Sequence, residues 1–332
     1  MIFQYKNTDG DMGKKMEIKN WSYEDYPEFK EIPDGAKSLK TSGDEIGVSY
    51  INDIVYDEVD GVELHLQILI PSSRNVQRPF IEEKSLFTNE SEKLLPCVCF
   101  VQGSAWMKQN IYASLPSLSK LSAKGYVVAT IEYRHSGIAP FPAQIVDARN
   151  AVRFLRKNAP RFYIDQTRMI VAGDSSGGHT ALFAGIRHND GNPENHFPGV
   201  SGDVRGIIDL YGSVTAMLDD GFPSTINHHT EASPEGMLMG GVNLKEHPDL
   251  TKEMSAECNI SFDTEIPPVL IFHGTKDRTI NPQQSVVLYE QLKRCGKDAS
   301  LYLIEGADHG GAEFWSDETI GIMDAFIKRC LD

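Results

Sequence analysis

The sequence predicts an α/β fold in which a mostly parallel central sheet is covered by helices on both faces. The first observation is a series of short, almost wholly apolar segments, which are typical of strands buried on both faces. The second is that these segments alternate with stretches whose apolar residues have helical spacing. The third is the length of 332 residues, which suits one large α/β domain.

The beginning of the fold is expected to be an antiparallel hairpin. Apolar and polar residues alternate over 48–59 and again over 62–71, and Asp60-Gly61 stands between the two runs. An Asp-Gly pair favours a tight two-residue turn, because both positions accept positive φ. We expect residues 1–45, which are polar with a few aromatic side chains, to form an N-terminal extension packed on the main domain of residues 46–332. Residues 72–95 are polar and are interpreted as an exposed insertion.

Buried strands and amphipathic helices are expected to alternate after the hairpin. The strands are predicted at 96–101, 126–134, 168–173, 204–212, 267–274 and 299–306, and the helices at 140–162, 179–186, 285–296 and 319–331. The alternation of strand and helix patterns stops between residues 212 and about 262, a segment rich in Met, Gly, Pro and His. A loop of this length inside a compact domain is usually functional, so we interpret it as a lid or cap inserted after a strand.

The composition excludes several classes of function. The chain has 47 acidic against 32 basic residues and a net charge of −15, so we expect neither nucleic-acid nor membrane partners. Five cysteines without paired spacing argue against a disulfide framework and a zinc site, and we expect no metal and no cofactor. Because the sequence has neither a signal-like segment nor an apolar run of 18 residues, a cytoplasmic location is expected.

The strongest motif is the run GDSSGG at residues 173–178, which lies between a predicted strand and a predicted helix. It satisfies G-x-S-x-G with Ser175 as nucleophile, in the strand–turn–helix context that the motif requires. The turn is so tight that the flanking residues must be small, and the N-terminus of the following helix directs free N–H groups at the reacting oxygen. The neighbouring Ser176 does not fit the motif and is expected to face inward.

A nucleophilic serine needs an imidazole to take its proton and a carboxylate to orient that imidazole. Asp277 follows the apolar strand that ends at residue 274, and His309 follows the next strand, so both are expected at the carboxyl edge of the sheet. The order Ser, Asp, His along the chain agrees with this assignment. Asp308 is adjacent to His309 and would have difficulty folding back onto its ring. His273 lies at the end of a strand and is interpreted as a structural, hydrogen-bonding residue.

The residues around the first buried strand resemble a known group of enzymes. The run QGSAW at residues 102–106 is similar to the His-Gly-Gly-x-Trp loop of the α/β-hydrolase esterases that include bacterial feruloyl-esterase-like and hormone-sensitive-lipase-like enzymes. Tyr133-Arg134, Phe141-Pro142-Ala143 and the helical run 147–153 also match that group. The resemblance implies an α/β-hydrolase fold with an oxyanion hole made by the amides of Ser104 and Ser176. The neighbouring amides of Gly103 and Ala105 stay open as alternatives to that of Ser104. Gln102 and Ser104 depart from the pattern, and the side chain of Gln102 is expected to support the loop.

These features together predict a serine carboxylesterase that acts through an acyl-enzyme. The resemblance implies small acyl esters, acetyl or hydroxycinnamoyl, with carbohydrates as candidate alcohols. Substrate-binding positions are expected at the strand ends, namely at Trp106, Tyr133, Phe141 and Tyr211. Three alternatives stay open: an amidase or peptidase, an aryl formamidase, and a non-catalytic binding module on a hydrolase scaffold. The sequence does not decide whether the chain forms a homo-oligomer.

Overall fold

The computed structural model describes residues 21–22, 24–73, 94–186, 194–218 and 223–332. The chain divides into two compact units, Met1–Ser42 and Gly43–Asp332. In the first unit, the rings of Trp21 and Tyr26 meet edge to face with their centroids 5.9 Å apart. That this N-terminal part packs on the main domain stays a prediction. Most of the insertion expected at residues 72–95 lies outside the described residues.

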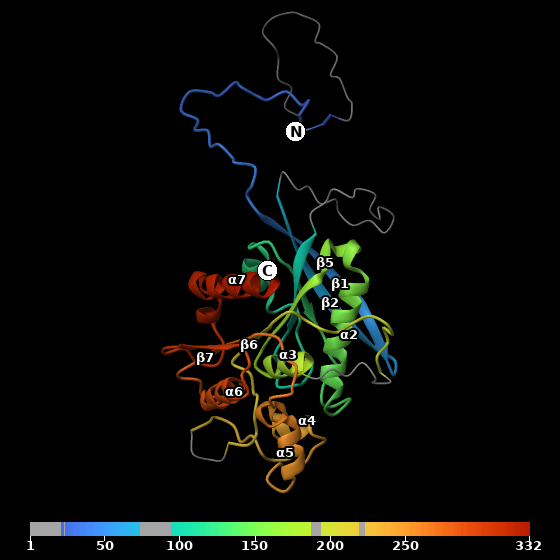
Figure 1. The fold of residues 1–332 in the computed structure, drawn as a ribbon. Coiled ribbons are helices and arrows are strands. Elements are labelled where there is room, and N and C mark those ends of the chain that lie inside the picture. Colours follow the sequence, from blue (N-terminus) through green and yellow to red (C-terminus); the bar gives the residue numbers. More distant parts are fainter. Residues whose placement is uncertain (1–20, 23, 74–93, 187–193, 219–222) are drawn as a thin grey trace, which may run out of the picture. The chain divides into compact units, whose positions relative to one another are not determined.

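The second unit contains one eight-stranded sheet, in the order β1-β2-β4-β3-β5-β6-β7-β8 (Figure 1). The pairs β1–β2 and β2–β4 are antiparallel and the other five pairs are parallel, so the predicted mostly parallel sheet with an antiparallel start is confirmed. The strands are β1 (Gly47–Val59), β2 (Val62–Ser72), β3 (Leu95–Val101), β4 (Val127–Ile131), β5 (Ile164–Asp174), β6 (Ile207–Leu210), β7 (Val269–Gly274) and β8 (Ala299–Ile304).

The hairpin between β1 and β2 turns at Asp60 and Gly61, as predicted. Val59 pairs with Val62 across the turn, and Asp60 and Gly61 have φ of +52° and +77°. Two consecutive positive φ values give a turn whose twist matches that of the strands. The register shifts twice further along the hairpin, between Ile51 and Ile54 and between Val55 and Asp57.

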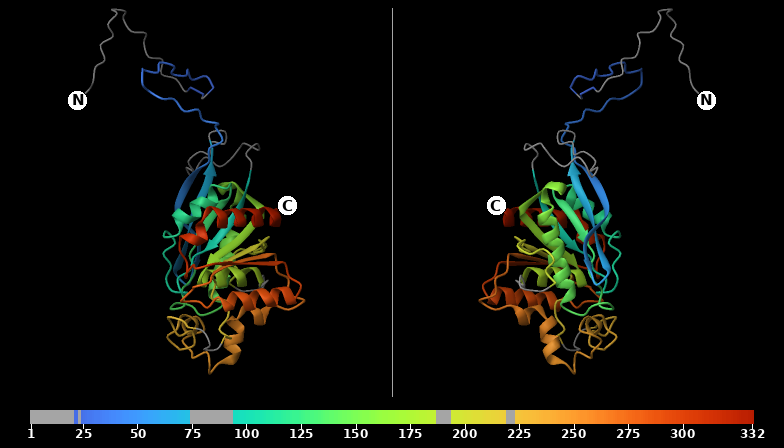
Figure 2. Two further views of the ribbon diagram at one scale, coloured as in Figure 1. Left: turned by 90° about the vertical axis from the view of Figure 1, so that its left-hand side faces the viewer. Right: turned by 90° about the vertical axis from the view of Figure 1, so that its right-hand side faces the viewer.

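Helices cover both faces of the sheet, as Figures 1 and 2 show. They are α1 (Leu115–Ser122), α2 (Ala143–Lys157), α3 (Ser176–Ile186), α4 (Pro234–Leu238), α5 (Pro248–Met254), α6 (Gln283–Arg294) and α7 (Asp317–Leu331), with short 3₁₀ turns at Ala159–Phe162, Ala256–Asn259 and Ala312–Trp315. The sequence predicted α2, α3, α6 and α7 but not α1, α4 or α5. No helix within the described ranges is long and apolar enough to span a membrane.

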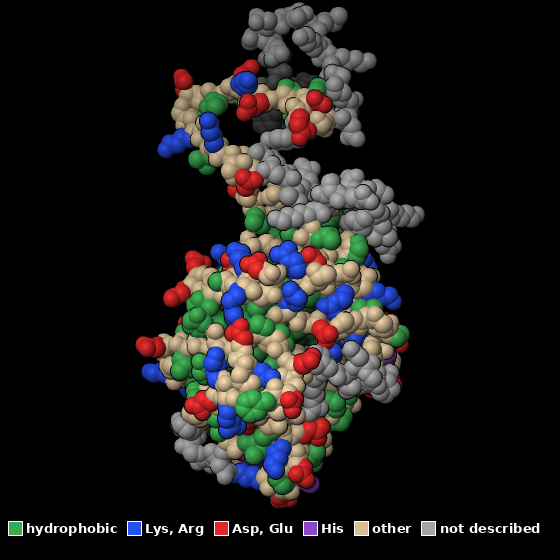
Figure 3. All heavy atoms as spheres, viewed as in Figure 1, with side chains coloured by type: hydrophobic (Ala, Val, Ile, Leu, Met, Phe, Trp, Pro, Cys, Tyr) green, Lys and Arg blue, Asp and Glu red, His purple; other side chains and the backbone are tan. Residues whose placement is uncertain are grey.

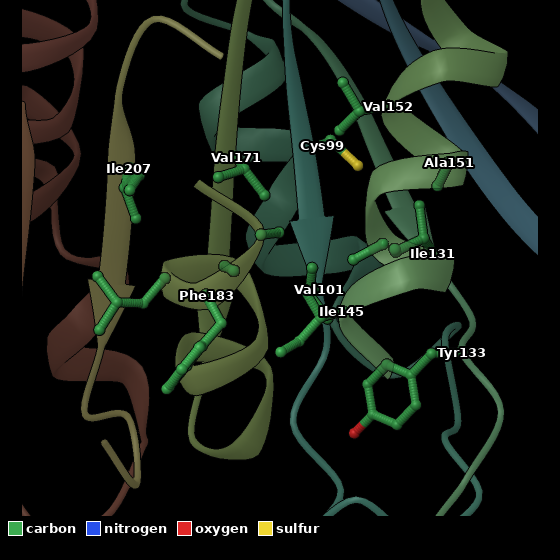
Figure 4. Close-up of a cluster of buried hydrophobic side chains, with 14 of the residues drawn as sticks. Cys99, Val101, Ile131, Tyr133, Ile145, Ala151, Val152, Val171, Phe183 and Ile207 are labelled. Atoms are coloured by element: carbon green, nitrogen blue, oxygen red, sulfur yellow. The ribbon is translucent and has the colours of Figure 1, made fainter. Parts of the chain in front are cut away.

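The central strands are buried on both faces because their side chains alternate between two cores. In β3, Cys97 and Cys99 belong to the core beneath α2 and α3, whereas Val98 and Phe100 belong to the core beneath α1 and α7. Figure 4 shows part of the first core, where strand side chains point toward α2 and α3. This alternation explains why the strands are apolar throughout, and it confirms that the two cysteines share one face.

The described residues of the segment between β6 and β7, 212–218 and 223–262, lie beyond the carboxyl ends of the parallel strands and include α4 and α5 (Figures 1 and 2). Leu238, Leu244 and Met254 of this segment are buried in the first core. Its backbone is also tied to the main domain, since the N–H of Phe141 donates to the carbonyl of Leu238 over 2.8 Å. The described part of the segment is therefore packed against the domain by apolar and polar contacts.

The outer surface of the second unit carries both signs of charge. On the face shown in Figure 3, acidic and basic side chains are interspersed with apolar ones. The excess of acidic residues over the whole chain is therefore not gathered into a single acidic patch on this face.

Candidate active site

Three polar side chains meet at the carboxyl edge of the parallel strands. Ser175 directly follows β5, Asp277 lies on the loop after β7, and His309 lies on the loop after β8. Parallel strands end at the same edge of the sheet, so loops from separate parts of the chain converge there. The structure thus brings together the three residues that the sequence suggested as nucleophile, acid and base.

The turn that carries Ser175 is strained and closely packed. Ser175 has φ of +53°, a left-handed conformation that L-residues rarely adopt. A Cβ atom on Gly173 would lie 2.2 Å from the carbonyl oxygen of Gly177, and one on Gly177 would lie 2.0 Å from that of Val101. Only glycine fits at these two positions, because α3 passes directly against the preceding strand.

A continuous hydrogen-bonded path joins the three side chains. Nε2 of His309 lies 2.9 Å from the Ser175 hydroxyl, and its Nδ1 lies 2.7 Å from Oδ2 of Asp277. A carboxylate only accepts hydrogen bonds, so the Nδ1 carries the proton and Nε2 is left as the acceptor for the serine hydroxyl. This is the tautomer that a general base requires.

Asp277 is surrounded by hydrogen-bond donors. Its Oδ1 accepts from the backbone N–H groups of Thr279 and Ile280, each over 2.8 Å, and its Oδ2 also receives Nε2 of His273 at 3.1 Å. Burial alone would raise the pKa of this carboxyl, but the hydrogen bonds from His273 and His309 outweigh burial and hold the pKa well below its ordinary value. Asp277 is therefore kept ionised.

His273 is a second imidazole on the same carboxylate, and it is fully buried. Its Nε2 also lies 3.0 Å from the carbonyl oxygen of Ile280, which only accepts, so Nε2 carries a proton. Its Nδ1 faces the Ser285 hydroxyl at 2.7 Å. The interpretation of His273 as a hydrogen-bonding residue holds, but its contact with the acid was not foreseen.

The loop after β3 lies directly on the turn that carries the nucleophile. The N–H of Gly103 donates to Oδ1 of Asp174 over 2.7 Å, and the N–H of Ser104 donates to the Ser176 hydroxyl over 2.9 Å. The Ser104 amide, expected as an oxyanion donor, is thus engaged within the protein. Positive φ values occur at Ala105 (+55°) and at the following residue, not at Ser104, so the serine side chain causes no strain there.

Among the residues that the structure describes, the backbone N–H groups of Ser176, at the N-terminus of α3, and of Ala105 have no acceptor. The side chain of Ser176 is buried, with 1% of its surface exposed, which agrees with the expectation that it faces inward. Unengaged amides beside a reactive serine are the donors that acyl transfer needs.

The four expected substrate-binding side chains are all buried, with exposed fractions between 1% and 9%. Trp106 packs edge to face on His179 with centroids 5.1 Å apart, and Phe141 packs in the same way on Phe183. Tyr211 contacts the ring of His309 edge to face at 4.9 Å. Little of these side chains is accessible to a substrate, and a binding role stays a prediction for Trp106, Tyr133, Phe141 and Tyr211.

A cavity of about 810 Å³ adjoins the loop that carries Asp277. Its lining includes residues 275–278 of that loop and residues 281–283 at the start of α6, but neither Ser175 nor His309. The cavity therefore reaches Asp277 but is not lined by the serine or the imidazole of the site. Asp308, the rejected acid, lies on its wall and pairs with Arg278 at 2.7 Å.

Some supporting residues were not identified from the sequence. The side-chain amide of Gln109, not that of Gln102, holds the loop after β3: its Nε2 donates to the carbonyl of Gln102 over 2.8 Å, and its Oε1 accepts from the N–H of Tyr133. Asp174 is half-buried beside the nucleophile, and the partial loss of solvent raises its pKa despite the hydrogen bond from Gly103. No sequence motif signals these contacts. The bond between Gln109 and Gln102 lies within one loop, whereas those to Tyr133 and from Gly103 to Asp174 join segments distant along the chain.

Comparison with known proteins identifies the family. The model of the BD-FAE family matches residues 86–292, which is more than half of the chain. The chain belongs to the BD-FAE family. The match includes β3, the nucleophile turn and the loop that carries Asp277, and it ends before His309. With its eight-stranded sheet and its helices on both faces, this BD-FAE protein has the α/β-hydrolase fold that the sequence predicted.

Curated relatives of this BD-FAE protein are named as esterases. Esterase LipC of Mycobacterium tuberculosis is 28% identical over 221 residues, which cover 66% of this chain and 53% of LipC. The probable isoprenylcysteine alpha-carbonyl methylesterase ICMEL1 of Arabidopsis thaliana is 26% identical over 255 residues, covering 70% of this chain and 49% of ICMEL1. The chain spans about half the length of the curated relatives it matches.

Solved structures show the same fold. A truncated form of a carbohydrate esterase from gut microbiota superposes with a TM-score of 0.69 at 24% identity, covering 87% of this chain and 98% of that one. A bifunctional GH43-CE protein of Bacteroides eggerthii superposes with a TM-score of 0.66 at 25% identity, covering 85% of this chain and 38% of the other.

Proposed function

We propose that this protein is a serine carboxylesterase that hydrolyses small acyl esters, acetyl or hydroxycinnamoyl, through an acyl-enzyme. The observation that carries the proposal is the unbroken path from the Ser175 hydroxyl through His309 to Asp277, with distances of 2.9 Å and 2.7 Å. A serine hydroxyl at this distance from a correctly protonated imidazole, which is itself oriented by an ionised carboxylate, is the arrangement that activates serine as a nucleophile.

The proposed reaction has two acyl-transfer steps. Nε2 of His309 takes the hydroxyl proton while Ser175 Oγ attacks the ester carbonyl, and the resulting imidazolium is stabilised by Asp277. The tetrahedral intermediate collapses when His309 gives its proton to the leaving alcohol. Water then attacks the acyl-enzyme, with His309 again acting as base, and Ser175 leaves with its proton restored.

The oxyanion donors in this proposal are the backbone N–H groups of Ser176 and Ala105. Both lack an acceptor within the described part of the chain, whereas those of Gly103 and Ser104 are already engaged. Ser176 opens α3, whose N-terminal end adds a favourable dipole for the developing negative charge. In this proposal the donor is Ala105, one of the two neighbours that the resemblance left open as alternatives to Ser104.

The substrate class rests on the motifs and on the relatives. The resemblance of residues 95–185 to feruloyl-esterase-like enzymes supports acetyl or hydroxycinnamoyl esters, including those of carbohydrates. LipC and ICMEL1 are named as an esterase and a probable methylesterase, which supports ester over amide substrates. We also propose that residues 212–262 act as a cap over the site.

Two measurements test the proposal. Wild type is expected to be labelled by a fluorophosphonate probe and to hydrolyse p-nitrophenyl acetate, and Ser175→Ala should lose both while keeping its thermal unfolding temperature. A panel of acetylated xylose, methyl ferulate, a long-chain ester and an acetyl anilide then separates the substrate classes. A wild type that is neither labelled nor active on any ester would favour the non-catalytic alternative. Faster cleavage of the anilide would favour an amidase.

A further inference from the structure

Three hydroxyl groups form a connected set beneath residues 102–107, the loop after β3, which is called the oxyanion loop below. The Tyr133 hydroxyl lies 3.1 Å from the Ser104 hydroxyl and 3.4 Å from that of Ser176. The Ser104 hydroxyl donates to the carbonyl of Met107 over 2.6 Å, and the backbone N–H of Ser104 donates to the Ser176 hydroxyl over 2.9 Å. Tyr133 and Ser176 are buried, with 2% and 1% of their surface exposed.

The direction of every hydrogen bond in this set follows from one carbonyl. The oxygen of Met107 only accepts, so the Ser104 hydroxyl uses its single proton there. Tyr133 must then be the donor to Ser104, and Ser176 must be the donor to Tyr133. The Ser176 oxygen keeps its lone pairs for the N–H of Ser104. The hydrogen bonds therefore run from the Ser104 N–H through Ser176 and Tyr133 back to the Ser104 hydroxyl and the Met107 carbonyl, so they start and end on the oxyanion loop.

The loop needs such support because its backbone is strained. Ala105 and Trp106 have φ of +55° and +53°, and neither is a glycine. Consecutive residues in this region persist only where the surroundings hold them. The supports are hydrogen bonds to both neighbours of the nucleophile, since Gly103 N–H is bound by Asp174 and Ser104 N–H by Ser176.

We propose that the Ser176 hydroxyl, braced by Tyr133, is a positioning group that holds the oxyanion loop so that the Ala105 N–H faces the reacting carbonyl. This inference rests on the proposed function and adds a second role to Ser176. Its backbone N–H contacts the oxyanion, and its side chain orients the other donor. Ser104 belongs to the same hydrogen-bonded set, because its backbone N–H donates to the Ser176 hydroxyl and its own hydroxyl accepts from Tyr133.

Ser176→Ala tests the inference because it removes the hydroxyl and keeps the backbone N–H. We expect kcat for p-nitrophenyl acetate to fall about 10- to 100-fold with KM within about threefold, as for a displaced oxyanion donor. Affinity for a trifluoromethyl ketone, which becomes tetrahedral on Ser175, should fall by the same factor as kcat/KM. Tyr133→Phe should give a smaller loss, about 3- to 10-fold, and should add nothing in the Ser176→Ala background.

Ser122→Ala is the matched control. Ser122 lies in α1, is fully buried, and its hydroxyl has no partner in the part of the chain that the structure describes. The control should leave kcat and ketone affinity unchanged, so that a loss confined to Ser176→Ala reports the site and not the removal of a buried hydroxyl.

Two results would overturn the inference. If Ser176→Ala keeps wild-type kcat and ketone affinity, the loop is held without the hydroxyl. If kcat rises, the hydroxyl instead withholds the Ser104 N–H from the oxyanion. Because both results are ratios to an active, probe-labelled wild type, they differ from failure of the proposed function, in which wild type itself is inactive and unlabelled.

Discussion

Substituting leucine for His273 is expected to lower kcat about tenfold with little change in KM, although this residue touches neither the nucleophile nor the base. Leucine fills much of the volume of the buried imidazole but donates no hydrogen bond. The carboxylate of Asp277 would keep three donors, from His309, Thr279 and Ile280, and lose the fourth.

The magnitude follows from the geometry of that fourth donor. A hydrogen bond to a charged group contributes about 1.5–3 kcal/mol, but the His273 Nε2–H is shared between Asp277 at 3.1 Å and the Ile280 carbonyl at 3.0 Å. Half of that range is about 0.75–1.5 kcal/mol, and a value near its upper end, about 1.4 kcal/mol, corresponds to the tenfold change in rate. The variant also leaves the Ile280 carbonyl and the Ser285 hydroxyl unpaired, which we expect to lower the free energy of unfolding by about 2–5 kcal/mol.

The assay separates the loss of the donor from the loss of stability. Ser285→Ala removes the partner on the far side of the ring, so it should cost about 1 kcal/mol of unfolding free energy and leave kcat within about twofold. Steady-state kinetics and urea unfolding of both variants give the comparison at one temperature.

A double-mutant cycle with Asp277→Asn decides whether His273 acts through the acid. Asp277→Asn alone should lower kcat by about 10³- to 10⁴-fold, because the amide favours the wrong tautomer of His309. In that background, His273→Leu should change kcat no further. A tenfold loss that persists in the Asp277→Asn background would refute the reasoning, since the effect would then not depend on the carboxylate.

Three further predictions concern pH and packing. Burial raises the pKa of Asp209 to about 7, so wild type loses stability as the pH rises from about 4 to 7. In urea unfolding, Asp209→Asn should therefore gain stability over wild type across this range, by up to about 1.4 kcal/mol per pH unit. Equal gains at pH 5 and pH 8 would contradict this. Burial opposes ionisation of His228, but its hydrogen bond to Glu235 raises its pKa above the ordinary value. The stabilisation from this pair is complete below about pH 6.5 and is lost as the pH rises through the raised pKa. In urea unfolding, Glu235→Gln should therefore approach the stability of wild type at alkaline pH, and a difference that grows with pH would contradict this. Gly103→Ala places a Cβ 2.4 Å from the Asp174 carbonyl, so kcat for p-nitrophenyl acetate should fall about 100-fold, and an active variant would show that the loop can move.

Local features of the sequence were sufficient for most of the sheet and for the order of its helices. Apolar runs at the positions of β3 to β7 predict strands buried on both faces, and Asp60-Gly61 predicts the hairpin turn. The run at β8 also predicts a strand, but β8 lies at the edge of the sheet and leaves Tyr302 and Leu303 exposed. The helix α1 was not predicted: its residues 115–122 contain Pro116 and three serines, which weaken the helical pattern. Its buried Leu118 and Leu121 pack against side chains of the sheet, and this tertiary contact is not visible in the local pattern.

The sequence by itself determined the candidate nucleophile and its partners, because a tight strand–turn–helix at residues 173–178 admits only small flanking residues and parallel strands end at a common edge. Only the tertiary structure decided which amides stay open beside Ser175, and that His273 shares the carboxylate of Asp277. These contacts depend on the positions of side chains from several loops, and such positions are set by packing over the whole domain rather than by the spacing of residues along the chain.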